Sequence, residues 1–291
     1  HTHTHKMDHP TRTDAWTVSP SGWTVRKSRA SPDITACLNE PPSPGPLGNM
    51  RGQSASVTEC PANNNILKKT FFSHTHLSAF NDEKENLLDP SCAKSFPELI
   101  AYTSASSKSQ KTLLIEKQKG TQLKHLPPLD PANQSRLKHA LVAAINDMGS
   151  CRIADRGCQN ILVLNTPAGF DIKMIDADRN WDNILDTNTS NIPDKEIHAA
   201  NLAYLAESML LFSKHNKDLF LPEISNATYI SALNHPALLA FFVNPVPKNQ
   251  NVSNLFKALE RKRSLTRPFI ALGRAPYDSP ALKYAAIWNT I

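Results

Sequence analysis

Two apolar runs that flank a turn form the clearest pattern in the chain. They cover residues 161–164 and 172–175, the second of which is interrupted by Lys173, and residues 165–170 between them include Asn, Pro and Gly. Short apolar runs bounded by such turn-forming residues are typical of buried strands. The pattern therefore predicts an antiparallel hairpin, in which Asn160, before the first strand, lies beside Asp176, after the second.

Helical periodicity dominates the rest of the second half. In residues 131–148, apolar side chains recur at i, i+3, i+4, i+7 and i+8, which predicts an amphipathic helix. Residues 193–213 form the longest helical pattern, and Pro193 suits its first turn. Further helices are expected near residues 228–242, 252–264 and 280–288.

The first half of the chain favours strands instead. Residues 56–60 and 66–71 flank a polar turn and predict a second hairpin, and residues 96–102 and 111–116 read as two more strands. One helix is expected in this half, beginning at Phe80.

The N-terminal segment shows neither the helical nor the strand period of apolar residues. Residues 1–46 are rich in Thr, Ser, Pro and charged residues, which favours a disordered or weakly ordered tail. Trp16 and Trp23 are exceptions that suit docking on the domain or a short strand. The chain thus divides into a tail, a β-rich part at 47–116 and a helical part at 117–291.

Composition narrows the class of protein. The net charge of +6 has no long basic run behind it, so a nucleic-acid partner is not expected. No apolar run reaches the length of a membrane span. The five scattered cysteines contain no C-x-x-C pair, which argues against a disulfide framework or a zinc site and favours the cytoplasm or another reducing compartment.

The ends of the predicted hairpin carry candidate chemistry. An amide oxygen from Asn160 and a carboxylate from Asp176 suit a hard cation such as Mg²⁺. Asp155 lies five residues before Asn160, in the loop that leads into the first strand. A carboxylate there is placed to accept a proton from an attacking hydroxyl.

This stretch resembles the protein-kinase-like superfamily, which includes eukaryotic-type kinases and aminoglycoside phosphotransferases. Asp155 and Asn160 keep the spacing of the family's H-R-D-x-x-x-x-N loop, and Asp176 stands where D-F-G follows a hairpin. The motifs are divergent, because Ile153 replaces the histidine and Ala177 replaces the phenylalanine. The resemblance implies that Asn160 and Asp176 bind Mg²⁺ and that Asp155 is catalytic.

The resemblance also assigns nucleotide-binding residues in the first half. Gly52 and Val57 match the glycine-rich loop G-x-G-x-x-G-x-V at two positions. Lys68 is chosen as the strand lysine that contacts the phosphates, with Lys69 on the opposite face. Glu83, near the start of the following helix, is expected to pair with that lysine.

Two further assignments follow from the same resemblance. Ile115 and Glu116 end a predicted strand before a Gly-containing linker, as in the kinase hinge that binds adenine, and Ile115 is the gatekeeper. Asn201, in the long helix, occupies the position of a residue that braces the catalytic loop.

The implied fold is α+β and bilobal, with a small antiparallel β-rich N-lobe and a helical C-lobe. The implied function is phosphoryl transfer from ATP, with Mg²⁺, to a protein hydroxyl, with Asp155 and Lys68 as catalytic residues. Three alternatives stay open: a small-molecule phosphotransferase, a pseudokinase that acts as a binding module, and an unrelated α+β interaction protein. Retention of the five central polar positions favours an active enzyme.

Overall fold

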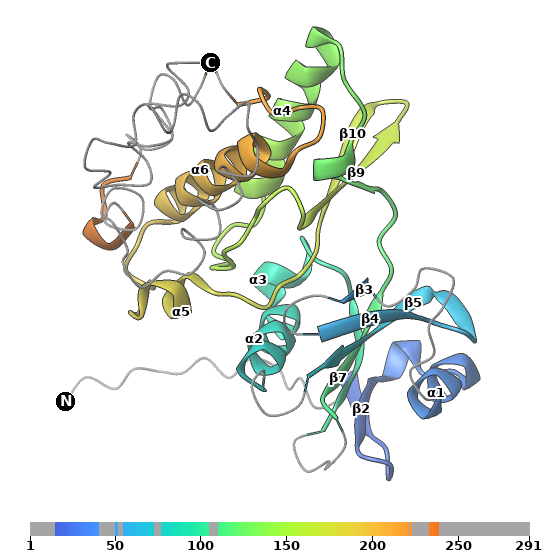
Figure 1. Cartoon of the computed structure of the whole chain (residues 1–291). Helices are drawn as coiled ribbons and strands as arrows, with labels where there is room; N and C mark the ends of the chain where they lie inside the picture. The colour runs from blue at the N-terminus through green and yellow to red at the C-terminus, as the bar shows by residue number, and fades with distance from the viewer. Residues whose placement is uncertain are drawn as a thin grey trace, which may run out of the picture. The chain divides into compact units, whose positions relative to one another are not determined.

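A computed structural model describes residues 15–40, 50–51, 55–72, 77–104, 110–220, 222 and 233–238. These residues belong to two compact units. Unit 1 comprises His1–Asp89 with Pro97–Gln118, and unit 2 comprises Pro90–Phe96 with Lys119–Ile291. Strands and helices both contribute, so the predicted α+β class is confirmed (Figure 1).

Unit 1 is built on an antiparallel sheet of seven strands in the order β1-β2-β6-β7-β5-β4-β3. The expected hairpin pairs β4 with β5, and its turn is shorter than predicted because β5 begins at Asn63. The strands are β1 (Trp16–Val18), β2 (Trp23–Arg26), β3 (Met50–Arg51), β4 (Ala55–Cys60), β5 (Asn63–Phe71), β6 (Leu99–Thr103) and β7 (Thr112–Glu116).

Helices cover both faces of this sheet. Helix α1 (Pro32–Asn39) packs on β5, and helix α2 (Leu77–Leu88) packs on β5, β6 and β7 (Figure 1). Lys68 contacts the end of α1 whereas Lys69 contacts α2. Since neighbouring residues of a strand point to opposite faces, the two helices lie on opposite sides of the sheet.

The N-terminal segment is partly ordered, so the predicted tail is wrong for residues 15–40. Strand β1 pairs with β2, which confirms the short-strand alternative for Trp16 and Trp23. A 3₁₀ turn (Lys27–Arg29) and α1 follow. Ser31 caps α1 by accepting a hydrogen bond from the main-chain N–H of Ile34 at 3.3 Å, and Pro32 occupies the first turn.

Four of the five cysteines pair, so the prediction of unpaired cysteines is wrong. Cys37 of α1 is joined to Cys60 of β4, and Cys92 is joined to Cys151. The partners are 23 and 59 residues apart in sequence, so no short spacing motif marks them. Cys158 is buried, and its thiol lies 3.4 Å from the main-chain oxygen of Ser208.

Unit 2 contains the central hairpin. Strand β9 (Ile161–Thr166) pairs antiparallel with β10 (Gly169–Met174), and β9 also pairs with β8 (Thr121–Gln122). The predicted hairpin is confirmed, although each strand extends further toward the turn than expected. The Thr166 hydroxyl donates to the Gly169 carbonyl at 3.1 Å and closes a two-residue turn.

The other elements of unit 2 are helical. Helix α4 (Pro131–Asn146) contacts β10 and α6 (Asp194–Phe212), close to the two helices expected from periodicity (Figure 1). Asp130 caps α4 by accepting from the main-chain N–H of Asn133 at 2.8 Å. Shorter helices are α3 (Pro90–Ala93), α5 (Trp181–Leu185) and a 3₁₀ turn (Leu123–His125).

The remaining helix predictions near the C-terminus, at 252–264 and 280–288, lie outside the described residues, as does most of 228–242. In the part of the chain that the structure describes, every helix is too short or too polar to cross a membrane.

Candidate functional site

The loop that carries Asp155 is tied to the segment that follows Asp176. The Ala154 N–H donates to the Arg179 carbonyl at 2.9 Å, and the Trp181 N–H donates to the Arg152 carbonyl at 3.0 Å. These two bonds flank an antiparallel bridge between residues 153 and 180. Two segments 27 residues apart therefore lie side by side within unit 2.

The hairpin brings Asn160 and Asp176 together as the sequence predicted. The Ile175 N–H donates to the Asn160 carbonyl at 3.0 Å, so Asp176 is one residue beyond the contact. The side-chain Nδ2 of Asn160 donates to the main-chain oxygen of Asp155 at 3.0 Å. Asp155, Asn160 and Asp176 thus converge at the open end of the hairpin.

Asp155 and Asp176 share an unusual backbone conformation. Their φ angles are 57° and 61°, in the left-handed region that non-glycine residues seldom adopt. Asp186, at the end of α5, is the other non-glycine residue of the described chain with positive φ. Such conformations persist only where the surroundings impose them, and they concentrate at functional sites.

Arg156 supplies much of that constraint. Its side chain is fully buried, and it donates to the main-chain oxygens of Ala154 at 3.0 Å, Ile175 at 2.8 Å and Asp176. Its guanidinium also lies 5.0 Å from the centre of the Phe96 ring. A planar group with five donors can bridge several carbonyls at once, which makes Arg156 the clamp between the loop and the end of the hairpin.

Opposing interactions act on the pKa of the Asp155 carboxyl. Burial raises the pKa of its carboxyl, and the nearby Asp176 acts in the same direction. Arg156, Arg179 and a hydrogen bond with the Tyr204 hydroxyl lower that pKa. A partly buried carboxylate with a raised pKa is a better proton acceptor than an exposed aspartate.

Helix α6 also contacts the loop that carries Asp155. Asn201 is fully buried; its Nδ2 donates to the Ile153 carbonyl at 3.2 Å, and its Oδ1 accepts from Trp181 Nε1 at 3.0 Å. Ile153, which replaces the family's histidine, is fully buried. The loop is therefore held by apolar packing and a buried amide, and Tyr204 reaches Asp155 from one turn further along α6.

In unit 1 the strand lysine that pairs with Glu83 is Lys69, so the predicted pairing of Lys68 with Glu83 is wrong. Lys69 Nζ lies 2.6 Å from Glu83 Oε2, and both side chains are buried. Lys68 points to the other face, where its Nζ donates to the carbonyls of Cys37 at 3.1 Å and Glu40 at 2.9 Å at the end of α1. Lys68 therefore stabilises the C-terminus of a helix.

Two other predicted nucleotide-binding residues share the face of Lys69. Val57 lies directly opposite Lys69 on the neighbouring strand β4. Ile115 lies opposite Leu67 on β7 and is buried. Because directly paired residues point to the same face, these side chains line the α2 side of the sheet.

Glu116 is on the opposite face, 3.8 Å from the Arg29 guanidinium. Gly52 lies outside the described residues, so the glycine-loop prediction stays a prediction.

The donor set of unit 2 fits magnesium. The described residues contain no group of three or more His, Cys, Asp or Glu side chains placed to bind a metal. Mg²⁺ is usually bound by one or two protein carboxylates together with water and substrate phosphates. Among the described contacts, no hydrogen bond uses Asn160 Oδ1, so this oxygen and the Asp176 carboxylate are the two groups that could bind Mg²⁺.

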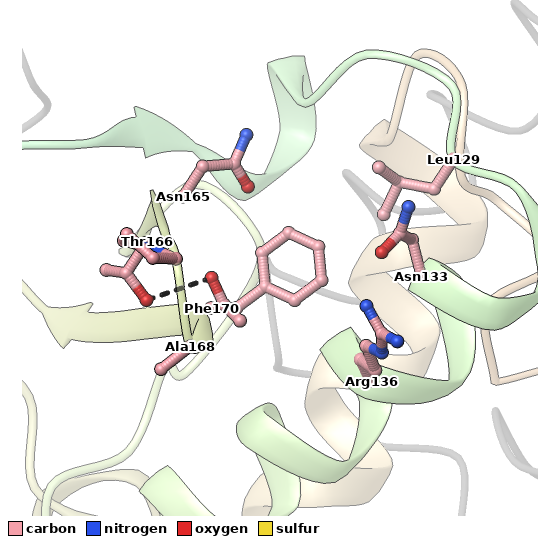
Figure 2. A pocket seen from close by; sticks show the side chains of 9 residues that line it. Leu129, Asn133, Arg136, Asn165, Thr166, Ala168 and Phe170 are labelled. Atoms are coloured by element: carbon pink, nitrogen blue, oxygen red, sulfur yellow. Dashed lines mark hydrogen bonds between the residues drawn. The ribbon is translucent and has the colours of Figure 1, made fainter.

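A groove of about 550 Å³ lies at the other end of the hairpin, against helix α4. Figure 2 shows Phe170 between the turn residues and α4, with Asn133 and Arg136 across from it. None of the site residues predicted from the sequence lines this groove. The groove is therefore a separate feature from the residues that converge near Asp155.

The sequence reasoning missed Arg156 and Tyr204. Arg156 directly follows Asp155, and this neighbouring opposite charge was a usable signal. Tyr204 lies three residues after Asn201, so the two share a helix face, but only the fold brings that face to Asp155. Comparison of the chain with protein-family models and with curated proteins gives no match.

Proposed function

We propose that this protein is a phosphotransferase with a bilobal, protein-kinase-like fold that transfers the γ-phosphoryl group of ATP, with Mg²⁺, to a protein hydroxyl. The observation that supports this most strongly is the convergence of Asp155, Asn160 and Asp176, with two of the three in a left-handed backbone conformation. Phosphoryl transfer of the kinase type uses a carboxylate that orients the substrate hydroxyl, placed beside two residues that bind the metal ion.

Each polar residue has a role in this proposal. Asn160 and Asp176 hold Mg²⁺, which when bound neutralises charge on the phosphates. Asp155 orients the acceptor hydroxyl and receives its proton. Lys69 takes the place first given to Lys68 and holds the phosphates, and Glu83 fixes its position through their ion pair.

The structure around the loop supports activity over a pseudokinase. The histidine that Ile153 replaces is compensated by the Asn201 bond to the loop and by full burial of Ile153. Ala177, at the position of the D-F-G phenylalanine, is also buried. The departures from the family motifs are thus packed positions, whereas the polar positions of the reaction are kept.

A small-molecule acceptor is the second candidate, favoured by the segment after Asp176. Helix α5 begins at Trp181 and α6 begins at Asp194, so only eight residues, 186–193, separate the two helices. A protein kinase commonly uses a longer segment here to dock a polypeptide. The short connection fits the aminoglycoside-phosphotransferase branch of the resemblance.

We also propose an oxidising compartment for folding, in place of the reducing one expected from the sequence. The reducing compartment rested on unpaired cysteines, and the structure pairs Cys37 with Cys60 and Cys92 with Cys151. Alkylation of the denatured protein without reductant should label Cys158 alone. Labelling of all five cysteines before reduction would contradict this compartment.

The function is tested by thermal stability with ATP, with and without Mg²⁺. We expect Mg²⁺-ATP to raise the melting temperature, since a ligand that binds the native state stabilises it. Asp176→Asn should abolish the Mg²⁺-dependent part of the shift, because the carboxylate is the charged ligand. Asp171→Asn, which removes an exposed carboxylate on β10, is the matched control. An unchanged shift in Asp176→Asn would contradict the metal assignment.

A further inference from the structure

Gln159 lies beside Asp155 in a position that the proposed roles leave unused. Its Nε2 lies 3.4 Å from Asp155 Oδ1, at the long end of hydrogen-bond distances. Its Oε1 is buried, and no described residue donates a hydrogen bond to it. A buried amide oxygen without a donor is costly, so such an atom calls for an explanation.

Gly157 explains how the amide reaches this place. A Cβ built on Gly157 would lie 2.6 Å from Gln159 Oε1 and 2.7 Å from Nε2. The amide therefore occupies the volume that any side chain at position 157 would fill. The Gln159 amide therefore lies where a side chain at position 157 would lie if that residue were not glycine.

The placement puts two hydrogen-bond acceptors next to each other. One is the Asp155 carboxylate and the other is Gln159 Oε1, with the Gln159 N–H group between them holding the carboxylate. Tyr204 donates to the same carboxylate, so neutral donors orient it. Two adjacent hydrogen-bond acceptors suit a substrate that offers two polar hydrogens. One of these hydrogens is on the hydroxyl that receives the phosphoryl group.

We propose that Gln159 is a substrate-positioning residue: its amide oxygen accepts a hydrogen bond from a second polar hydrogen of the phosphoryl acceptor, while its N–H orients Asp155. This inference rests on the proposed phosphotransferase function and specifies the class of acceptor. A serine or threonine residue meets the requirement, since its own main-chain N–H lies next to the hydroxyl-bearing carbon. Water meets it as well, with its second O–H.

The reaction balances as a simple displacement. The acceptor oxygen forms a bond to the γ-phosphorus, and the bond from that phosphorus to the β,γ-bridging oxygen breaks. ADP leaves with the bridging oxygen, and the proton of the acceptor hydroxyl passes to Asp155. Gln159 exchanges no proton; it fixes the direction in which the acceptor oxygen points.

The test compares three single variants with the wild-type full chain. Gln159→Met keeps length and removes both hydrogen bonds, and Gly157→Ala displaces the amide without changing it. Gln134→Met on α4 is the matched control, because the Gln134 side chain takes part in none of the described hydrogen bonds. Melting curves establish that each variant folds.

Release of phosphate from labelled Mg²⁺-ATP into water and transfer to dephosphorylated casein are measured in parallel. We expect Gln159→Met and Gly157→Ala to lower kcat in both reactions by roughly 10–10²-fold while the KM for ATP stays within about twofold, as misplacement of one reactant predicts. A structural role alone would lower stability without this split between kcat and KM.

The other outcomes separate the two proposals. An active wild type with equal kcat in Gln159→Met overturns the role of Gln159 and leaves the phosphotransferase function standing. If Gln159→Met fails to fold, Gly157→Ala decides by the same criterion. If the wild type neither hydrolyses ATP nor transfers phosphate, the proposed function fails and the role of Gln159 fails with it.

Discussion

The polar residues of the two units are held in place by different means. In unit 2, Asp155, Asn160 and Asp176 are positioned by hydrogen bonds to main-chain atoms and by the backbone conformation itself. In unit 1, Lys69 is positioned by an ion pair with Glu83, a contact between the ends of two side chains. The first arrangement is fixed by the path of the main chain, whereas the second includes an ion pair between two side chains.

This difference predicts where single substitutions act. Replacing the Asp155 or Asp176 carboxylate should leave the loop in place, because the Arg156 bonds and the residue 153–180 bridge do not involve these carboxylates. Replacing Glu83 should remove the ion pair that it forms with Lys69 at a buried position, which is costly for a buried charge. Substitutions of Asp155 and Asp176 should therefore disturb folding less than a substitution of Glu83.

The largest effect expected in unit 1 distinguishes its two neighbouring lysines. Lys69→Met should lower phosphoryl transfer by roughly 10²-fold, the scale seen when one preorganised charge-stabilising donor is removed. Lys68→Met should leave transfer nearly unchanged and cost about 1–3 kcal/mol of stability, because helix carbonyls lose their donor. Transfer rates and urea unfolding of both variants measure this. The reverse pattern would restore Lys68 as the functional lysine.

A smaller effect, on stability, is expected where α6 braces the Asp155 loop. Asn201→Ala removes the hydrogen bonds that Asn201 makes with the buried Ile153 carbonyl and with the Trp181 indole N–H, at about 1–3 kcal/mol for each. Asn191→Ala, at an exposed position, is the control. Urea unfolding of the two variants measures the difference, and equal stability would show that the brace contributes nothing.

The smallest effect concerns pH. Burial raises the pKa of Asp155, so transfer should decline on acidification at a higher pH than an exposed aspartate would give. The Tyr204 hydroxyl favours the ionised carboxylate and lowers that pKa. Tyr204→Phe should therefore raise the pKa further and move the acid limb of the profile to higher pH. A shift toward lower pH would contradict this role of Tyr204.

The hairpin in unit 2 could be predicted because its geometry is local. Asn160 and Asp176 are separated by two strands and a turn, and antiparallel pairing brings them together in any fold that keeps the hairpin. The helices 131–148 and 193–213 were predictable for a similar reason, since their apolar period is long.

Local pattern could not predict which face of the sheet each of Lys68 and Lys69 lies on. Strand β5 is covered on both faces, by α1 and by α2, so its sequence lacks the alternation that would mark one side as solvent-exposed. Only the position of Glu83 on α2 decides which lysine it meets.

The cysteine pairs were missed because their partners are distant in sequence. Cys37 pairs with Cys60 only because residues 15–40 fold onto the sheet, and that segment has a composition typical of a tail. Its two tryptophans were the one signal of order, because such side chains gain much from burial.

Transfer of labelled phosphate from Mg²⁺-ATP by the wild type and by Asp155→Asn tests the phosphotransferase proposal most directly. The substitution keeps the size of the side chain and removes the charge that receives the proton. We expect ATP binding to survive and transfer to fall by roughly 10²–10⁴-fold, with Asp171→Asn behaving as the wild type. Equal transfer by Asp155→Asn and the wild type would contradict the role of Asp155. Tight ATP binding by a wild type that transfers no phosphate would contradict the enzyme and identify a pseudokinase.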